Sequence, residues 1–124
     1  MSKEPLVAVI DDDEPFRTAL VESLVSLGYE ARSFSSAEDF FARAEAIAWA
    51  CVITDIHMSG MSGFDVKRLL TARAPKVPVI MITARGDPGL EAKAAAVGAV
   101  CLLRKPFESS ALIDCLNKAL LRGP

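Results

Sequence analysis

Residues 51–63 read CVITDIHMSGMSG, a short apolar run that ends in one carboxylate and gives way to a loop of small residues. The run at 51–54 is short and contains β-branched residues, which predicts a strand buried on both faces. An acid, Asp55, at the carboxyl end of such a strand needs a physical reason. His57 follows two residues later, which raises the question of whether it shares the role of Asp55.

Outward from this stretch, the chain alternates between apolar runs and segments with helical periodicity. Further strands are expected over residues 6–10, 29–34, 77–83 and 99–103. Helices are expected over residues 15–27, 36–46 and 64–72, and from Asp87 or Pro88 to 97, with a last helix that Ser109 or Ser110 caps and that reaches 121. Five strands alternating with five helices predict an α/β fold, with a parallel sheet covered by helices on both faces.

Length and composition indicate one globular domain spanning residues 1–124, with 52% hydrophobic residues to fill its core. A net charge of −2 provides no attraction to nucleic acid or to an anionic membrane. No signal peptide is expected from the short polar start of the sequence, and no apolar stretch approaches the ~20 residues needed to cross a bilayer. Cys51, Cys101 and Cys115 lie in apolar runs without zinc-binding spacing, which predicts reduced thiols in a cytoplasmic protein.

Polar residues gather where the predicted strands end, at the edge where an open parallel sheet binds ligands. These residues are Asp11, Asp12 and Asp13 after the first strand, Asp55 after the third, Thr83 after the fourth and Lys105 after the fifth. Carboxylates this close disfavour joint ionisation unless a cation lies among them, and hard oxygen ligands favour Mg²⁺. A metal beside an ammonium and a hydroxyl suits phosphoryl transfer, with Asp55 as the best candidate for the nucleophile. We expect Asp13 to face water or to start the following helix.

Four motifs follow one another in a familiar order: VIDDD at 9–13, TDIHM at 54–58, TA at 83–84 and KPF at 105–107. With them the chain resembles, from residue 7 to 120, the CheY-like receiver domain of two-component response regulators, and most nearly the receivers of FixJ-type nitrogen-fixation regulators. The resemblance implies a doubly wound, flavodoxin-like (βα)5 fold with a five-stranded parallel sheet in the order 2-1-3-4-5. It also implies a phosphoacceptor that catalyses its own phosphotransfer and autodephosphorylation, and not an enzyme acting on a separate substrate.

The resemblance further implies a role for each residue of the site. Asp55 matches the phosphoacceptor, which takes a phosphoryl group from a sensor histidine kinase in a Mg²⁺-dependent reaction. The metal ligands would be Asp55, Asp12 directly, Asp11 through water, and the backbone carbonyl of His57. Two further residues match groups that contact the phosphoryl group, namely the hydroxyl of Thr83 and the ammonium of Lys105, whose peptide bond to Pro106 is cis in relatives.

The sequence departs from the family pattern at a few positions. Ser59 stands where relatives usually carry proline, so we expect a somewhat more mobile loop. Leu102 stands where relatives usually carry the tyrosine or phenylalanine that swings inward, which puts aromatic coupling in doubt. His57 and Arg85 occupy two positions that in relatives tune hydrolysis of the aspartyl-phosphate. We expect their side chains to alter phosphoryl lifetime, although the alternative for His57 is an exposed imidazole without a role.

The resemblance assigns signalling to the surface formed by the fourth helix, the fifth strand and the fifth helix, roughly residues 88–121. This surface would form a homodimer on phosphorylation, or dock an output domain or a downstream protein. The sequence contains no DNA-binding element and no membrane segment. A stand-alone receiver and a piece of a longer transcription factor would look alike at this level.

Two other interpretations remain open. A phosphatase of the haloacid-dehalogenase type would use Asp11 and Asp13 as nucleophile and acid/base, but Glu14 and Pro15 follow where that motif needs threonine or valine. It also needs a late acidic pair, which only Asp87 could begin.

The second interpretation is a degenerate receiver that binds partners without phosphorylation. The complete set of acids, together with Thr83 and Lys105, argues against it, while Leu102 keeps it open.

Overall fold

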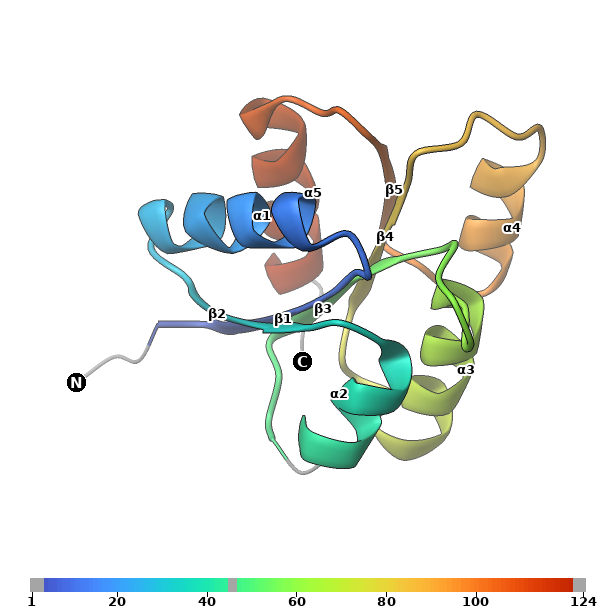
Figure 1. Cartoon of the computed structure of the whole chain (residues 1–124), viewed down its shortest axis with the longest axis horizontal. Coiled ribbons are helices and arrows are strands. Elements are labelled where there is room, and N and C mark those ends of the chain that lie inside the picture. Colours follow the sequence, from blue (N-terminus) through green and yellow to red (C-terminus); the bar gives the residue numbers. More distant parts are fainter. Residues whose placement is uncertain (1–3, 45–46, 122–124) are drawn as a thin grey trace.

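Five parallel strands form one sheet in the order β2-β1-β3-β4-β5 (Figure 1). The computed structural model describes residues 4–44 and 47–121. The strands of this part of the chain are β1 (Leu6–Ile10), β2 (Glu30–Phe34), β3 (Cys51–Asp55), β4 (Val79–Thr83) and β5 (Cys101–Arg104). Because β1 pairs with β2 on one side and β3 on the other, the strand order reverses between β1 and β3. The predicted α/β class and strand order are confirmed, and the reversal marks the place where such sheets bind ligands.

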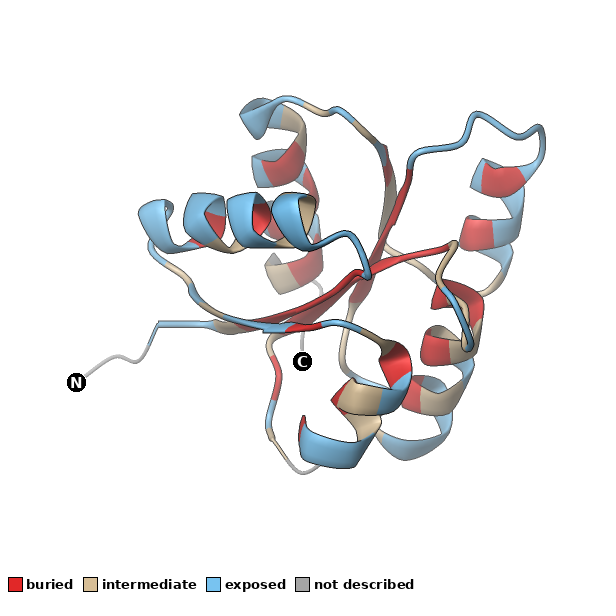
Figure 2. Cartoon of the chain, viewed as in Figure 1, coloured by how far each residue is buried: buried red, intermediate tan, exposed pale blue. Residues whose placement is uncertain are grey.

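Helices cover both faces of the sheet, as the alternating pattern predicts. They are α1 (Glu14–Ser26), α2 (Ala37–Ala44), α3 (Gly63–Arg73), α4 (Leu90–Ala96) and α5 (Ser109–Leu121). Helices α1 and α5 lie on one face, and α2, α3 and α4 lie on the other (Figure 1). Figure 2 shows that the buried residues line the sheet and the inward sides of the helices.

The core consists of two apolar layers, one on each face of the sheet. Successive residues of a strand point to opposite faces, so β1 sends Val7 and Val9 to the layer under α1 and α5, and Ala8 and Ile10 to the other. Every residue of β3 and β4 is buried. A strand buried on both faces cannot carry an ionisable residue without a compensating partner, which brings the carboxyl end of β3 into focus.

Several predicted helix ends are confirmed by specific contacts. The carboxylate of Asp13 caps α1 by accepting a hydrogen bond from the Phe16 N–H at 3.2 Å, with Pro15 in the first turn. The hydroxyl of Ser36 accepts one from the Asp39 N–H at 3.0 Å, as a capping residue does. The predicted end of α2 at residue 46 lies outside the described residues.

Other predicted boundaries are wrong. Helix α4 begins at Leu90 and not at Asp87 or Pro88; it follows Gly89, whose φ of +85° is a left-handed conformation suited to glycine. The carboxylate of Asp87 instead lies 3.9 Å from a guanidinium nitrogen of Arg85. Helix α5 already includes Ser109 and Ser110, so neither serine is the capping residue before it, and β4 begins two residues later than predicted.

The three cysteines are free thiols. Cys51 and Cys115 are buried in the layer under α1 and α5, and Cys101 is half-buried there. Burial raises the pKa of both Cys51 and Cys115 to about 12, so these thiols stay protonated at neutral pH. Two of the three therefore act as small core residues, as predicted. Among the described residues, no helix is long and apolar enough to span a bilayer.

Gly63, the first residue of α3, lies so close to the end of β3 that a side chain would collide with it. A Cβ at this position would lie 2.6 Å from the Asp55 carbonyl oxygen and 3.0 Å from the Ile56 Cα. We expect Gly63→Ala to lower the free energy of unfolding by about 2 kcal/mol, because backbone on both sides must shift. Urea denaturation measures this loss.

Gly86→Ala is the matched control, since the nearest atom to its added Cβ would be 3.8 Å away. Its effect should stay within about 0.5 kcal/mol. Equal losses for the two variants would contradict the steric argument.

Candidate functional site

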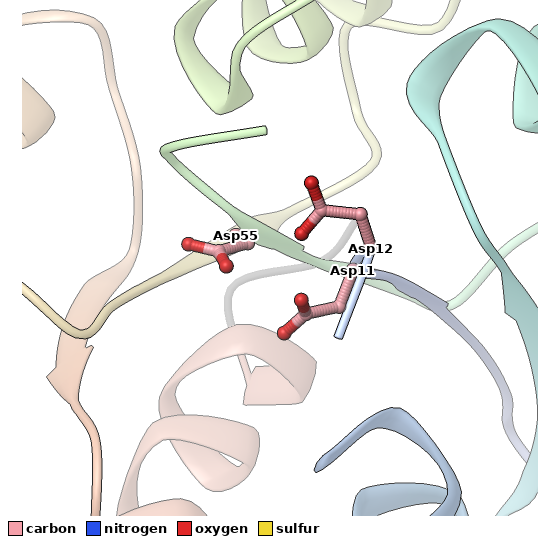
Figure 3. Close-up of side chains that lie close together, drawn as sticks. All are labelled: Asp11, Asp12 and Asp55. Carbon is pink, nitrogen blue, oxygen red and sulfur yellow. The ribbon is translucent and has the colours of Figure 1, made fainter. Parts of the chain in front are cut away.

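Three carboxylates meet at the carboxyl edge of the sheet. Asp11 follows β1 and is fully buried, Asp12 beside it is exposed, and Asp55 ends β3 with 6% of its surface exposed. Their side chains lie close together (Figure 3), and one carboxylate oxygen from each lies within 4.8 Å of the other two. The structure therefore brings together the three acids that the sequence predicts as a group. Asp13 does not join them, because its carboxylate caps α1.

Lys105 enters this cluster from the loop after β5. Its ammonium nitrogen Nζ lies 2.9 Å from Asp11 Oδ2 and 3.2 Å from Asp55 Oδ2. The same nitrogen lies 4.1 Å from the centre of the Phe16 ring, a contact that the sequence did not suggest. The peptide bond between Lys105 and Pro106 is cis. Lys105 thus partly neutralises two buried carboxylates at once.

The pKa values in this cluster follow from burial and charge. Burial raises the pKa of Asp55 most, the charge of Asp11 raises it further, and Lys105 opposes both effects. Burial alone would lower the pKa of Lys105. The close contact with Asp11 and the charges of Asp55 and Asp11 outweigh it, so the pKa of Lys105 is raised. Lys105 therefore stays protonated, but its single positive charge does not balance the two carboxylates of Asp11 and Asp55.

The residues present fit a divalent cation. Asp11 Oδ2 is buried and, within the described part of the chain, accepts no hydrogen bond of good geometry; its partner is the charge of Lys105. Two of the three carboxylates, Asp11 and Asp55, contact this ammonium, and the oxygens of all three are the hard ligands that Mg²⁺ prefers. A bound cation would balance the remaining charge.

Thr83 ends β4 and is fully buried, and His57 and Arg85 lie next to it at the edge of the site. Its hydroxyl accepts a hydrogen bond from the Arg85 N–H at 3.0 Å and lies 3.4 Å from Nδ1 of His57. The carboxylate of Asp87 lies 4.0 Å from His57 Nε2 and 3.9 Å from Arg85. Of the two side chains predicted to influence the site, the His57 imidazole therefore lies beside Thr83, and the Arg85 guanidinium is linked to that imidazole through the Asp87 carboxylate. The His57 N–H also donates to Asp55 Oδ1 at 3.3 Å, so the backbone at this position adjoins the acid cluster.

The loop after β3 is held by two contacts that sequence reasoning missed. The Ser59 N–H donates to Asp12 Oδ2 at 3.3 Å, a bond that a proline at this position could not make. The Met61 N–H donates to Glu38 Oε2 at 3.0 Å, which joins the loop to α2. Greater mobility of this loop stays a prediction. Ser59 does not fix φ as a proline would, but its N–H donates a hydrogen bond to the candidate metal ligand Asp12.

The fold and the site together define a phosphorylation-dependent signalling module. The response regulator receiver domain, as a family, matches residues 7–117. The chain belongs to this family, whose members are phosphoacceptors in two-component systems. The predicted family is thereby confirmed, and the phosphatase interpretation fails as well on the position of Asp13 at the cap of α1.

Individual relatives agree with this assignment. The transcriptional regulatory protein TdiR of Thauera aromatica is 35% identical over 114 residues, covering 92% of this chain and 50% of TdiR. The transcriptional regulatory protein FixJ of Rhizobium meliloti (strain 1021) is 34% identical over 113 residues, covering 91% of this chain and 55% of FixJ. The chain thus spans about half the length of these curated relatives.

Solved structures confirm the flavodoxin-like fold and the predicted likeness to FixJ-type receivers. The crystal structure of FixJ-N superposes with a TM-score of 0.87 at 32% identity, covering 97% of this chain and 96% of FixJ-N. Full-length FixJ from B. japonicum superposes with a TM-score of 0.88 at 30% identity, covering 98% of this chain and 60% of that one.

Without a divalent cation, we expect Asp55→Asn to stabilise the protein at pH 7. The pKa of Asp55 is raised in the folded state, so above the ordinary carboxyl pKa the native state binds more protons than the unfolded state. Stability from this group is therefore present at low pH and lost as the pH rises through the raised pKa. Calorimetry in EDTA should show a Tm about 4 °C higher for the variant at pH 7, with the difference shrinking toward pH 4.

Glu22→Gln removes an exposed carboxylate of α1 and is the control. It should leave the Tm nearly unchanged at both pH values. A Tm for Asp55→Asn below that of the wild type at pH 7 would contradict the electrostatic reading of the site.

Proposed function

We propose that Asp55 accepts a phosphoryl group from a phosphohistidine of a sensor histidine kinase, in a reaction that depends on Mg²⁺. The observation that carries this proposal is the position of Asp55, a carboxylate at the end of a fully buried strand, 3.2 Å from an ammonium and grouped with two further acids. Asp11, Asp12, Asp55 and the backbone carbonyl of His57 would hold the cation. When bound, Mg²⁺ would neutralise charge on the oxygens of the transferring phosphoryl group.

The residues around Asp55 have distinct tasks in this transfer. One carboxylate oxygen of Asp55 forms the new P–O bond while the P–N bond to the donor histidine breaks. Lys105, held near that carboxylate, pairs with phosphoryl oxygens once the negative charge has moved outward. The Thr83 hydroxyl accepts from the Arg85 N–H at 3.0 Å and donates to the Arg85 carbonyl at 3.4 Å, so its proton would turn from that carbonyl to a phosphoryl oxygen. Hydrolysis of the aspartyl-phosphate later restores the carboxylate and releases inorganic phosphate.

We further propose that phosphorylation is signalled through the face formed by α4, β5 and α5. Thr83 ends β4, which pairs with β5, and Lys105 follows β5, so both phosphoryl-contacting residues adjoin this face. The face would mediate dimerisation on phosphorylation, or dock an output domain or a downstream protein. Direct binding of nucleic acid by this chain is not part of the proposal. The free thiols of the chain suit a cytoplasmic location.

Acetyl phosphate with Mg²⁺, followed by intact-mass measurement, tests the phosphoacceptor. The wild type should gain one phosphoryl group, and Asp55→Asn should gain none because the attacking carboxylate is missing. Asp13→Asn is the matched control, since Asp13 lies next to the metal-binding pair but caps α1, and it should still gain the group. No gain by the wild type would contradict the proposal and favour a degenerate receiver that binds partners without phosphorylation.

The double variant His57→Ala, Arg85→Ala tests the two side chains around Thr83. Both flank the approach to the phosphoryl group, so their removal admits water more freely and should speed loss of the aspartyl-phosphate by roughly threefold or more. Phosphorylation itself should persist. The decay is followed by phosphate release, with Arg32→Ala, an arginine of β2, as control. Unchanged decay in the double variant would show that neither side chain governs phosphoryl lifetime.

A further inference from the structure

One contact of Lys105 has no task in the function proposed above. Its ammonium nitrogen Nζ lies over the ring of Phe16, 4.1 Å from the ring centre, in addition to its contacts with Asp11 and Asp55. The face of an aromatic ring is electron-rich and attracts a cation, most strongly where water is excluded. Only 12% of the Lys105 side chain is exposed, so this attraction acts in largely desolvated surroundings.

The Phe16 ring is itself held in place by three contacts. It lies in the first turn of α1, where the Phe16 N–H donates to the Asp13 carboxylate at 3.2 Å. The next residue, Arg17, donates from Nη1 to the Asp11 carbonyl at 2.7 Å and so joins this turn to the end of β1. Phe107 packs against the ring from the loop after β5, with 5.8 Å between the ring centres and 79° between the ring planes. A ring fixed in this way presents a constant face to the ammonium.

We propose that Phe16 is a positioning residue for phosphoryl transfer, which acts by holding the Lys105 ammonium beside Asp55. This inference rests on the proposed function of Asp55. As one oxygen of Asp55 forms the new P–O bond, negative charge leaves that carboxylate, and its attraction for Lys105 weakens. The attraction of the Phe16 ring does not change in this step. The ring therefore keeps the ammonium in a place without water, where it can pair with the phosphoryl oxygens.

The chemical signature of such a contact is its dependence on the electron density of the ring. Phenylalanine with one, two or three fluorine atoms keeps nearly the same shape, but each fluorine withdraws electrons from the face of the ring. These residues are incorporated at position 16 alone, and phosphorylation by acetyl phosphate with Mg²⁺ is followed over time by intact mass. Acetate leaves with the electron pair of the broken P–O bond in every case. The rate should fall with each fluorine and be about fivefold lower with three.

Two ordinary substitutions complement this series. Phe16→Leu keeps an apolar side chain without a ring, so it should be phosphorylated about fivefold more slowly than the wild type. Phe16→Tyr keeps the aromatic face and should stay within about twofold of the wild type. In NMR spectra, the Lys105 Hε resonances should move downfield in Phe16→Leu and not in Phe16→Tyr, because the shielding by the ring is lost only with leucine.

Phe41 of α2 is the matched control. A guanidinium, that of Arg73, lies over its ring at 5.5 Å from the ring centre, so it makes the same kind of contact. Phe41 packs on the face of the sheet opposite to Phe16. Trifluorinated phenylalanine at position 41 should therefore leave the rate of phosphorylation unchanged.

Equal rates across the fluorinated series at position 16 would overturn the proposal even if Phe16→Leu is slow, because the ring would then contribute packing alone. Unmoved Lys105 resonances in Phe16→Leu would overturn it too. Failure of the proposed function looks different, since the wild type would then gain no mass from acetyl phosphate. The NMR comparison would still decide whether the ring holds the ammonium.

Discussion

The structure depends on one electrostatic constraint, the meeting of two buried carboxylates with a single ammonium. Asp11 and Asp55 are withdrawn from water at the edge of the sheet, and Lys105 lies within 3.2 Å of both. Coulomb interactions are strong where water is excluded, so both carboxylates are attracted to Lys105 and the two repel each other. The parallel sheet makes the meeting unavoidable, because the ends of β1 and β3 lie side by side at the point where strand order reverses.

Contacts from the surrounding loops accompany this constraint. Carboxylates that lack enough positive charge repel one another, so other contacts have to hold the backbone segments that carry them in place. The Ser59 N–H bonds Asp12, Glu38 of α2 holds the same loop at Met61, and Gly63 lets α3 begin against the backbone of Asp55. Backbone donors and close packing thus hold the site in place. The negative charge that Lys105 does not balance remains for a cation.

Much of this fold and site was predictable from local sequence patterns and from the geometry of the sheet edge. The strands, the caps at Asp13 and Ser36, and the convergence of Asp55 with the acids after β1 follow from periodicity and from the geometry of parallel sheets. Contacts between residues far apart in the chain were not predictable. Ser59 and Asp12 are separated by 47 positions, and no local pattern links them. The predicted start of α4 was wrong for a similar reason, because the Asp87 side chain faces Arg85 and does not cap the helix.

Leu102 leaves the connection between the site and α4 to a different side chain. It is half-buried against the layer under α2, α3 and α4, and it has no ring to swing. On the same strand, Arg104 donates to the Arg85 carbonyl at 3.1 Å and to Glu91 of α4 at 3.4 Å. The turn that holds the Thr83 hydroxyl is thereby joined to both β5 and α4 by one guanidinium. Exposed pairs of this kind are worth only ~0–1 kcal/mol, so the link adds little stability. If phosphorylation of Asp55 is signalled through α4, as proposed above, a link this weak would be broken by a small free-energy difference.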